Sequence, residues 1–163
     1  IASDIKYTFS YGKKAANFIT KNNLKNWIIS GRDDFALSTV IGYANIKNAY
    51  FEQGNRTGSF VMWDTKRKKD VLTDEELIIK TKELQNTYNK NALIIVNRPI
   101  EDKLVEKYSL AFIALFYENP VIKDEIYGFY IFKWLVPLLL NNQLYPAKLI
   151  ITAIKMPTKL FNW

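Results

Sequence analysis

The strongest constraint on the fold is an alternation of short apolar runs with segments of helical periodicity. Mostly apolar residues stand together at 27–30, 49–51 and 92–96, where their number and composition fit buried β-strands. Apolar residues also recur at helical spacing over 15–24, before the first run, and over 35–43, between the first and the second. Strands that alternate with helices predict a parallel sheet with helices on both of its faces.

A capping box gives the clearest local signal for a helix. In the sequence Thr73-Asp74-Glu75-Glu76, the hydroxyl of Thr73 can accept from a free backbone amide while the carboxylate of Glu76 reaches back to the amide of Thr73. The helix is predicted to end near residues 89–91, with its buried side formed by Leu77, Ile78, Leu84 and Tyr88. The continuous apolar run at 92–96 then predicts a strand covered on both faces.

The remainder of the chain predicts a short helix and a hairpin. The helix is expected over 100–108, and two strand-like runs at 110–117 and 125–132, separated by turn residues, predict an antiparallel pair. For residues 1–133 we therefore predict a three-layer α/β domain with a mostly parallel, Rossmann-like sheet and a terminal antiparallel hairpin. Residues 134–163 form an apolar, lysine-containing tail, expected to be helical and either packed on the domain or close to a membrane. The apolar run that leads into this tail, residues 126–140, is too short and too interrupted to span a membrane.

Composition excludes several kinds of chemistry. The chain has no Cys and no His, which excludes disulfides, zinc sites of the Cys/His type and histidine-based catalytic triads. It also lacks the glycine patterns of dinucleotide-binding and P-loop proteins. No nucleophile can be paired with a base by spacing, so we assign no catalytic residue, no metal and no cofactor, and whether the chain belongs to an enzyme stays open.

The charge is strongly basic, and lysine dominates it. Lys and Arg number 23 against 16 acidic residues, a net charge of +7, yet only four of the basic residues are Arg. We interpret the excess as a lysine-rich solvated surface. Nucleic-acid binding through the basic run 66–69 and the tail is a less favoured alternative, because Arg suits phosphate recognition best and is scarce here.

Candidate ligand-binding residues lie in three loops that should meet at one edge of the sheet. In an open parallel sheet, ligands bind beyond the carboxyl ends of the strands, which here lead into residues 31–34, 53–58 and 97–98. These loops hold three of the four arginines, so we expect a site for a small or anionic ligand. The candidate residues are Arg32, Asp33, Asp34, Gln53, Asn55, Arg56, Asn97 and Arg98.

Two features of these loops also have structural interpretations, which we favour. Asp33 precedes a predicted helix and can serve as its N-terminal cap. Gly54 and Gly58 could present backbone amides to an anion, but a tight connection also requires glycine for its backbone conformation.

Three segments carry a resemblance to a known family. They are YTFSYGKKAANFI at 7–19, IISG with DFALSTVIGY between 28 and 43, and, most recognisably, AYFEQGNRTGSFVMWD at 49–64. Together they resemble the soluble C-terminal domain of certain bacterial polytopic membrane proteins, some of which look like glycosyltransferases that use lipid-linked sugars. The resemblance extends to about residue 133. In such transferases the catalytic acid belongs to the membrane portion, so no catalytic residue carries over to this chain.

The resemblance implies a first hypothesis for function. The chain would be a non-catalytic, extracytoplasmic domain attached to the membrane portion of its parent protein, where it helps to position a sugar or lipid-phosphate substrate. A small-ligand or anion-binding module at the sheet edge is the second hypothesis, and a basic nucleic-acid-binding domain is the third.

Overall fold

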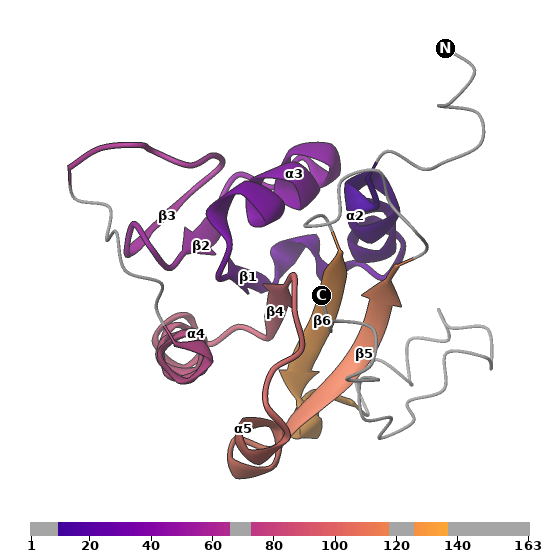
Figure 1. Cartoon of the computed structure of the whole chain (residues 1–163), viewed down its shortest axis with the longest axis vertical. Helices are drawn as coiled ribbons and strands as arrows, with labels where there is room; N and C mark the ends of the chain where they lie inside the picture. Colours follow the sequence, from indigo (N-terminus) through magenta and orange to yellow (C-terminus); the bar gives the residue numbers. More distant parts are fainter. Residues whose placement is uncertain (1–9, 66–72, 118–125, 137–163) are drawn as a thin grey trace.

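A six-stranded sheet organises the described part of the molecule. The computed structural model describes residues 10–65, 73–117 and 126–136, and its strand order is β3-β2-β1-β4-β6-β5 (Figure 1). The strands are β1 (Ile28–Gly31), β2 (Ala49–Phe51), β3 (Arg56–Gly58), β4 (Ala92–Val96), β5 (Leu110–Phe116) and β6 (Tyr127–Phe132). The helices are α2 (Gly12–Lys21), α3 (Asp34–Ala44), α4 (Asp74–Tyr88) and α5 (Asp102–Lys107), with 3-10 turns at Leu24–Asn26 and Lys133–Leu135.

The sheet is mixed, which corrects the prediction of a mostly parallel one. Only β2, β1 and β4 are parallel to one another, with Ile29 of β1 opposite Ala49 on one side and Leu93 on the other. The sequence was expected to place a loop over 53–58, but β3 pairs antiparallel with β2 there. Four residues separate these two strands, and so short a connection joins only antiparallel strands.

The predicted antiparallel pair at the end of the domain is confirmed. β5 and β6 pair along their length, with a register shift between Phe112 and Ala114. β6 also pairs antiparallel with β4, so the second strand of the pair, not the first, joins the parallel core. The connection between β5 and β6 lies outside the described residues.

Helices cover both faces of the sheet, as Figure 1 shows. Successive residues of a strand point to opposite faces, and β1 makes this visible. The hydroxyl of Ser30 is 2.7 Å from that of Thr81 in α4, whereas a Cβ on Gly31 would lie 3.1 Å from the side chain of Leu37 in α3. α3 and α4 therefore lie on opposite faces.

The other two helices follow the same division. Phe18 of α2 packs edge-on against Phe129 of β6, with ring centres 5.6 Å apart. The neighbouring Tyr130 points the other way, where its hydroxyl accepts a hydrogen bond of 3.3 Å from the amide of Ile100, just before α5. α2 thus shares a face with α3, and α5 shares a face with α4.

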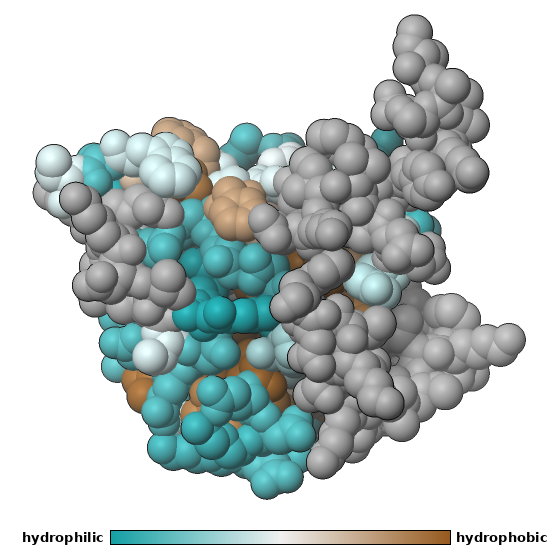
Figure 2. Space-filling model, in the orientation of Figure 1, coloured by the Kyte–Doolittle hydropathy of each residue, from teal (hydrophilic) through white to brown (hydrophobic). Residues whose placement is uncertain are grey.

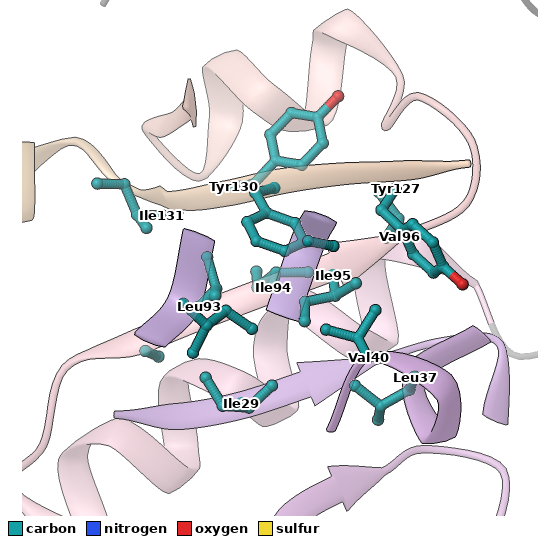
Figure 3. Close-up of a cluster of buried hydrophobic side chains, with 14 of the residues drawn as sticks. Ile29, Leu37, Val40, Leu93, Ile94, Ile95, Val96, Tyr127, Tyr130 and Ile131 are labelled. Carbon is teal, nitrogen blue, oxygen red and sulfur yellow. The ribbon is translucent and has the colours of Figure 1, made fainter. Parts of the chain in front are cut away.

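The core is continuous from β1 through β4 to β6. Figure 3 shows side chains of these strands gathered with Leu37 and Val40 of α3. All five residues of β4 and all six of β6 are buried. This confirms the prediction that the 92–96 run is covered on both faces, and it fixes the central strands rigidly enough to position the loops at their ends.

The capping box of α4 is present as predicted. The amide of Glu76 donates to the hydroxyl of Thr73 over 3.2 Å, and the amide of Thr73 donates to the carboxylate of Glu76 over 2.8 Å. Asp33 differs from expectation: it occupies the residue before α3, but its side chain makes no capping hydrogen bond.

The predicted tail lies almost wholly outside the described residues. Lys133–Leu135 forms a 3-10 turn directly after β6, and the description ends at Val136. In the described part of the chain, no helix is long and apolar enough to cross a membrane.

Candidate ligand-binding site

The three parallel strands bring their carboxyl ends to one rim of the sheet. From β1 the chain enters α3 on one face, and from β4 it continues to α5 on the other face. Connections that leave toward opposite faces mark the position in the strand order at which open α/β sheets commonly bind ligands. Figure 2 shows hydrophilic residues between the positions of α3 and α4 and over α5.

Two of the predicted arginines converge on one carboxylate at this rim. Arg32, immediately after β1, is 7% exposed, and its Nη1 donates to Oδ1 of Asp74 over 2.5 Å. Nη2 of Arg98, after β4, lies 4.0 Å from the same oxygen. Asp74 is the first residue of α4, so the helix dipole further favours its negative charge.

A buried carboxyl group stands beside this pair without a hydrogen-bond partner. Glu52 follows β2 and is 2% exposed, and neither of its carboxylate oxygens has a partner among the described residues. Burial raises the pKa of Glu52 from 4.5 to about 8; the nearby Arg32 opposes this rise, whereas the charges of Glu76, Asp74 and Asp33 add to it. At neutral pH the group is therefore mostly a neutral carboxylic acid.

A cavity of about 250 Å³ adjoins the buried carboxyl group. Tyr50 and Asn55 form part of its wall, and the hydroxyl of Tyr50 donates to Oδ1 of Asn55 over 3.0 Å. α4 contributes the opposite side with Glu76, Ile79, Lys80 and Glu83. Nε of Arg32 is also buried and has no hydrogen-bond partner among the described residues. We call Glu52, Arg32, Asn55 and this cavity the rim site.

The remaining predicted residues lie at the same rim in different settings. Asp34 is buried in the first turn of α3, while Asp33, Gln53 and Asn97 are half-buried. Arg56 pairs with an acid other than Asp74: its guanidinium makes two hydrogen bonds to the carboxylate of Asp64, at 2.7 and 3.0 Å. The three arginines therefore do not form one cluster.

The glycines of the 54–58 segment are not required for backbone conformation. Neither has a positive φ, and the left-handed residue is Asn55, at 45°. A Cβ at Gly54 would instead lie 2.7 Å from Nε of Arg56. The interpretation that this connection requires glycine for its backbone conformation is therefore wrong. Gly54 instead makes room for the side chain of Arg56.

Two residues of the rim escaped the sequence-based prediction of the site. Asp74 was assigned only to the start of the helix, although that start faces the strand ends. Glu52 is the first residue after β2 and stands two positions after Tyr50, so the side chains of both residues point to the same face of the sheet. This spacing was visible in the sequence. Within the described ranges, no group of three acidic side chains is arranged to hold a metal ion.

The chain was compared with models of protein families, with curated proteins and with solved structures, and no match was found.

Proposed function

We propose that this domain binds a small polyhydroxylated ligand, of the sugar class, at the rim site. One observation carries the proposal: the buried carboxyl of Glu52 and the buried Nε of Arg32 lie near each other, both lack a hydrogen-bond partner among the described residues, and a cavity adjoins the carboxyl. Buried polar groups left unsatisfied cost about 1–3 kcal/mol each. A ligand that bonds both groups offsets that cost.

The protonation state of Glu52 favours hydroxyl groups over anions. A neutral carboxylic acid offers one donor and one acceptor, and the Nε–H of Arg32 offers a further donor. A sugar hydroxyl can both donate and accept, so adjacent hydroxyls match this set. An anion would instead meet the negative charges of Asp33, Asp74 and Glu76, which already raise the pKa of Glu52.

A sugar ligand also agrees with the family resemblance in the sequence. On that basis we propose that the chain is a non-catalytic, extracytoplasmic domain of a polytopic membrane protein resembling lipid-linked-sugar glycosyltransferases. The rim site would hold the sugar of such a substrate. The gene upstream of this chain tests the attachment independently, because the proposal requires membrane-spanning segments there.

The binding proposal is tested by titrating the isotope-labelled protein with glucose, galactose and mannose and following backbone amides by NMR. We expect millimolar binding to at least one hexose, with shifts confined to residues 31–34, 50–55 and 76–83. Glu52→Ala should abolish the shifts. Glu52→Gln keeps a neutral donor and acceptor and should retain binding within about threefold at neutral pH.

The matched control is Glu106→Gln, an exposed change of the same chemistry in α5. It should leave the titration unchanged. If inorganic phosphate shifted the rim amides and no hexose did, the site would be an anion site, and the polyhydroxyl proposal would be rejected. Hexose shifts that persist in Glu52→Ala would reject it equally.

A further inference from the structure

A second and larger cavity lies at the opposite end of the parallel strands. Its volume is about 440 Å³, within the range of small-molecule sites. The segments that enter β1 and β2 form its floor, and the second half of α4 forms a wall. Tyr50 of β2 lines both this cavity and the rim site, so the two cavities are neighbours on the α4 face of the sheet.

The lining of this amino-end cavity has one sign of charge. Lys25, Lys47 and Lys90 contribute to it, and none of the described residues that line it is Asp or Glu. All three lysines are exposed, and in the described part of the chain no ion pair joins any of them to a carboxylate. Three exposed ammonium groups from three separate segments raise the local concentration of anions.

Aromatic and amide side chains complete the lining. Trp27 is half-buried just before β1, and Tyr88, the last residue of α4, is 58% exposed. Asn26 and Asn48 add side-chain donors and acceptors. A free inorganic anion needs none of these groups, whereas a planar ring can stack on exposed aromatic faces.

We propose that the amino-end cavity binds a phosphorylated ligand with a planar ring, of the nucleoside monophosphate class. The lysines neutralise the phosphate, and Trp27 and Tyr88 contact the ring. Lysine meets phosphate as a compact point charge and does not require a fixed fork geometry. This site is separate from the rim site in position, charge and ligand, and it stands whether or not a sugar binds at the rim.

The test is a titration of the labelled full chain with AMP, adenosine and inorganic phosphate at low salt. AMP should shift the amides of residues 25–28, 46–48 and 88–90, and should bind at least tenfold more tightly than adenosine or phosphate. Its affinity should fall as salt is added, since exposed charges are screened. Lys47→Glu should weaken AMP at least tenfold, and Tyr88→Ala should weaken AMP severalfold without changing the response to phosphate.

Lys82→Glu is the matched control, because Lys82 is an exposed lysine of α4 that does not line the cavity. It should bind AMP nearly as the unsubstituted protein does. Equal affinities for AMP and phosphate would overturn the proposal, as would an equal loss in Lys47→Glu and Lys82→Glu. Circular dichroism and the melting temperature of each variant identify a failure to fold, and for a variant that fails, Lys90→Glu replaces it.

Discussion

The two cavities on either side of Tyr50 share a strand and a helix but differ in charge and in burial. The rim site contains the buried Glu52 and Arg32, whereas the amino-end cavity presents exposed lysines. Buried groups bind through hydrogen bonds of defined geometry, and exposed charges attract by field alone. We therefore expect pH to control the first cavity and salt concentration to control the second.

The largest predicted effect breaks the rim site by removing Arg32. Arg32→Met leaves Asp74 as a poorly solvated carboxylate, and removal of one partner of a buried ion pair costs about 3–5 kcal/mol. Arg98 lies 4.0 Å from Asp74 and compensates in part, so we expect about 3 kcal/mol, measured by urea unfolding. The double variant with Asp74→Asn should recover at least about 1 kcal/mol; strictly additive losses would contradict the pairing.

The second prediction uses the raised pKa of Glu52. An acid whose pKa is higher in the folded protein binds its proton more tightly when folded. The free energy of unfolding therefore falls as pH rises from about 4.5 to about 8, the range between the two pKa values of Glu52. Glu52→Gln has no such cost. It should be more stable than the unsubstituted protein by about 2 kcal/mol at pH 9, and the difference should disappear by pH 4.

The control for this prediction is Glu106→Gln, which removes an exposed carboxylate. Its difference from the unsubstituted protein should be small and should not follow that pH range. If the advantage of Glu52→Gln were the same at pH 4 and pH 9, Glu52 would not titrate with a raised pKa. Glu52 does not line the amino-end cavity, and no described residue that does is an acid. Its affinity for AMP should therefore be unaffected by Glu52→Gln.

The third prediction separates the two ends of α4, which forms a wall of both cavities. Thr73→Ala removes the capping box, for which we expect a loss of about 1 kcal/mol. Because the effect of a cap is confined to the first turn, the segment containing Asp74 and Glu76 should exchange its amide hydrogens faster. Tyr88 lies at the other end of α4, so the amino-end cavity should keep its AMP affinity. Uniformly faster exchange along α4 would contradict this separation.

The sequence predicted the strands and helices better than it predicted their arrangement. The periodicity over 35–43 and the capping box at Thr73 are local, so they can be seen without the fold. The antiparallel pairing of β3 was missed because Arg56–Gly58 is short and polar, and only its neighbour β2 makes it a strand. Likewise the pairing of β6 with β4 joins segments far apart in the sequence, so no local pattern contains it.

The sequence predicted which loops meet at the rim of the sheet but not the contacts within them. Strand order places residues 31–34, 52–55 and 97–98 at one rim once the parallel core forms, whereas β3 leads back from the rim and sets Gly58 opposite Ala49 at the other end of β2. Which arginine pairs with which acid depends on side-chain reach, so the separation of Arg56 from Arg32 was not visible. Glu52 was missed because a charged residue after a strand is expected to be solvated, and here the packing of the rim buries it instead.

The smallest predicted effect concerns Arg56 and sharpens the boundary of the rim site. Its ion pair with Asp64 is partly exposed, and such pairs contribute about 0–1 kcal/mol. Arg56→Ala should therefore change stability by less than about 1 kcal/mol and leave hexose binding unaltered, whereas Arg32→Met should abolish binding. Since both changes remove one positive charge from the same rim, the contrast distinguishes a site built on buried hydrogen bonds from one built on net charge. Equal losses of hexose binding in both variants would mean that the rim acts by the overall field of its positive charges, as the lysines of the amino-end cavity do, and the contrast drawn here between the two cavities would be lost.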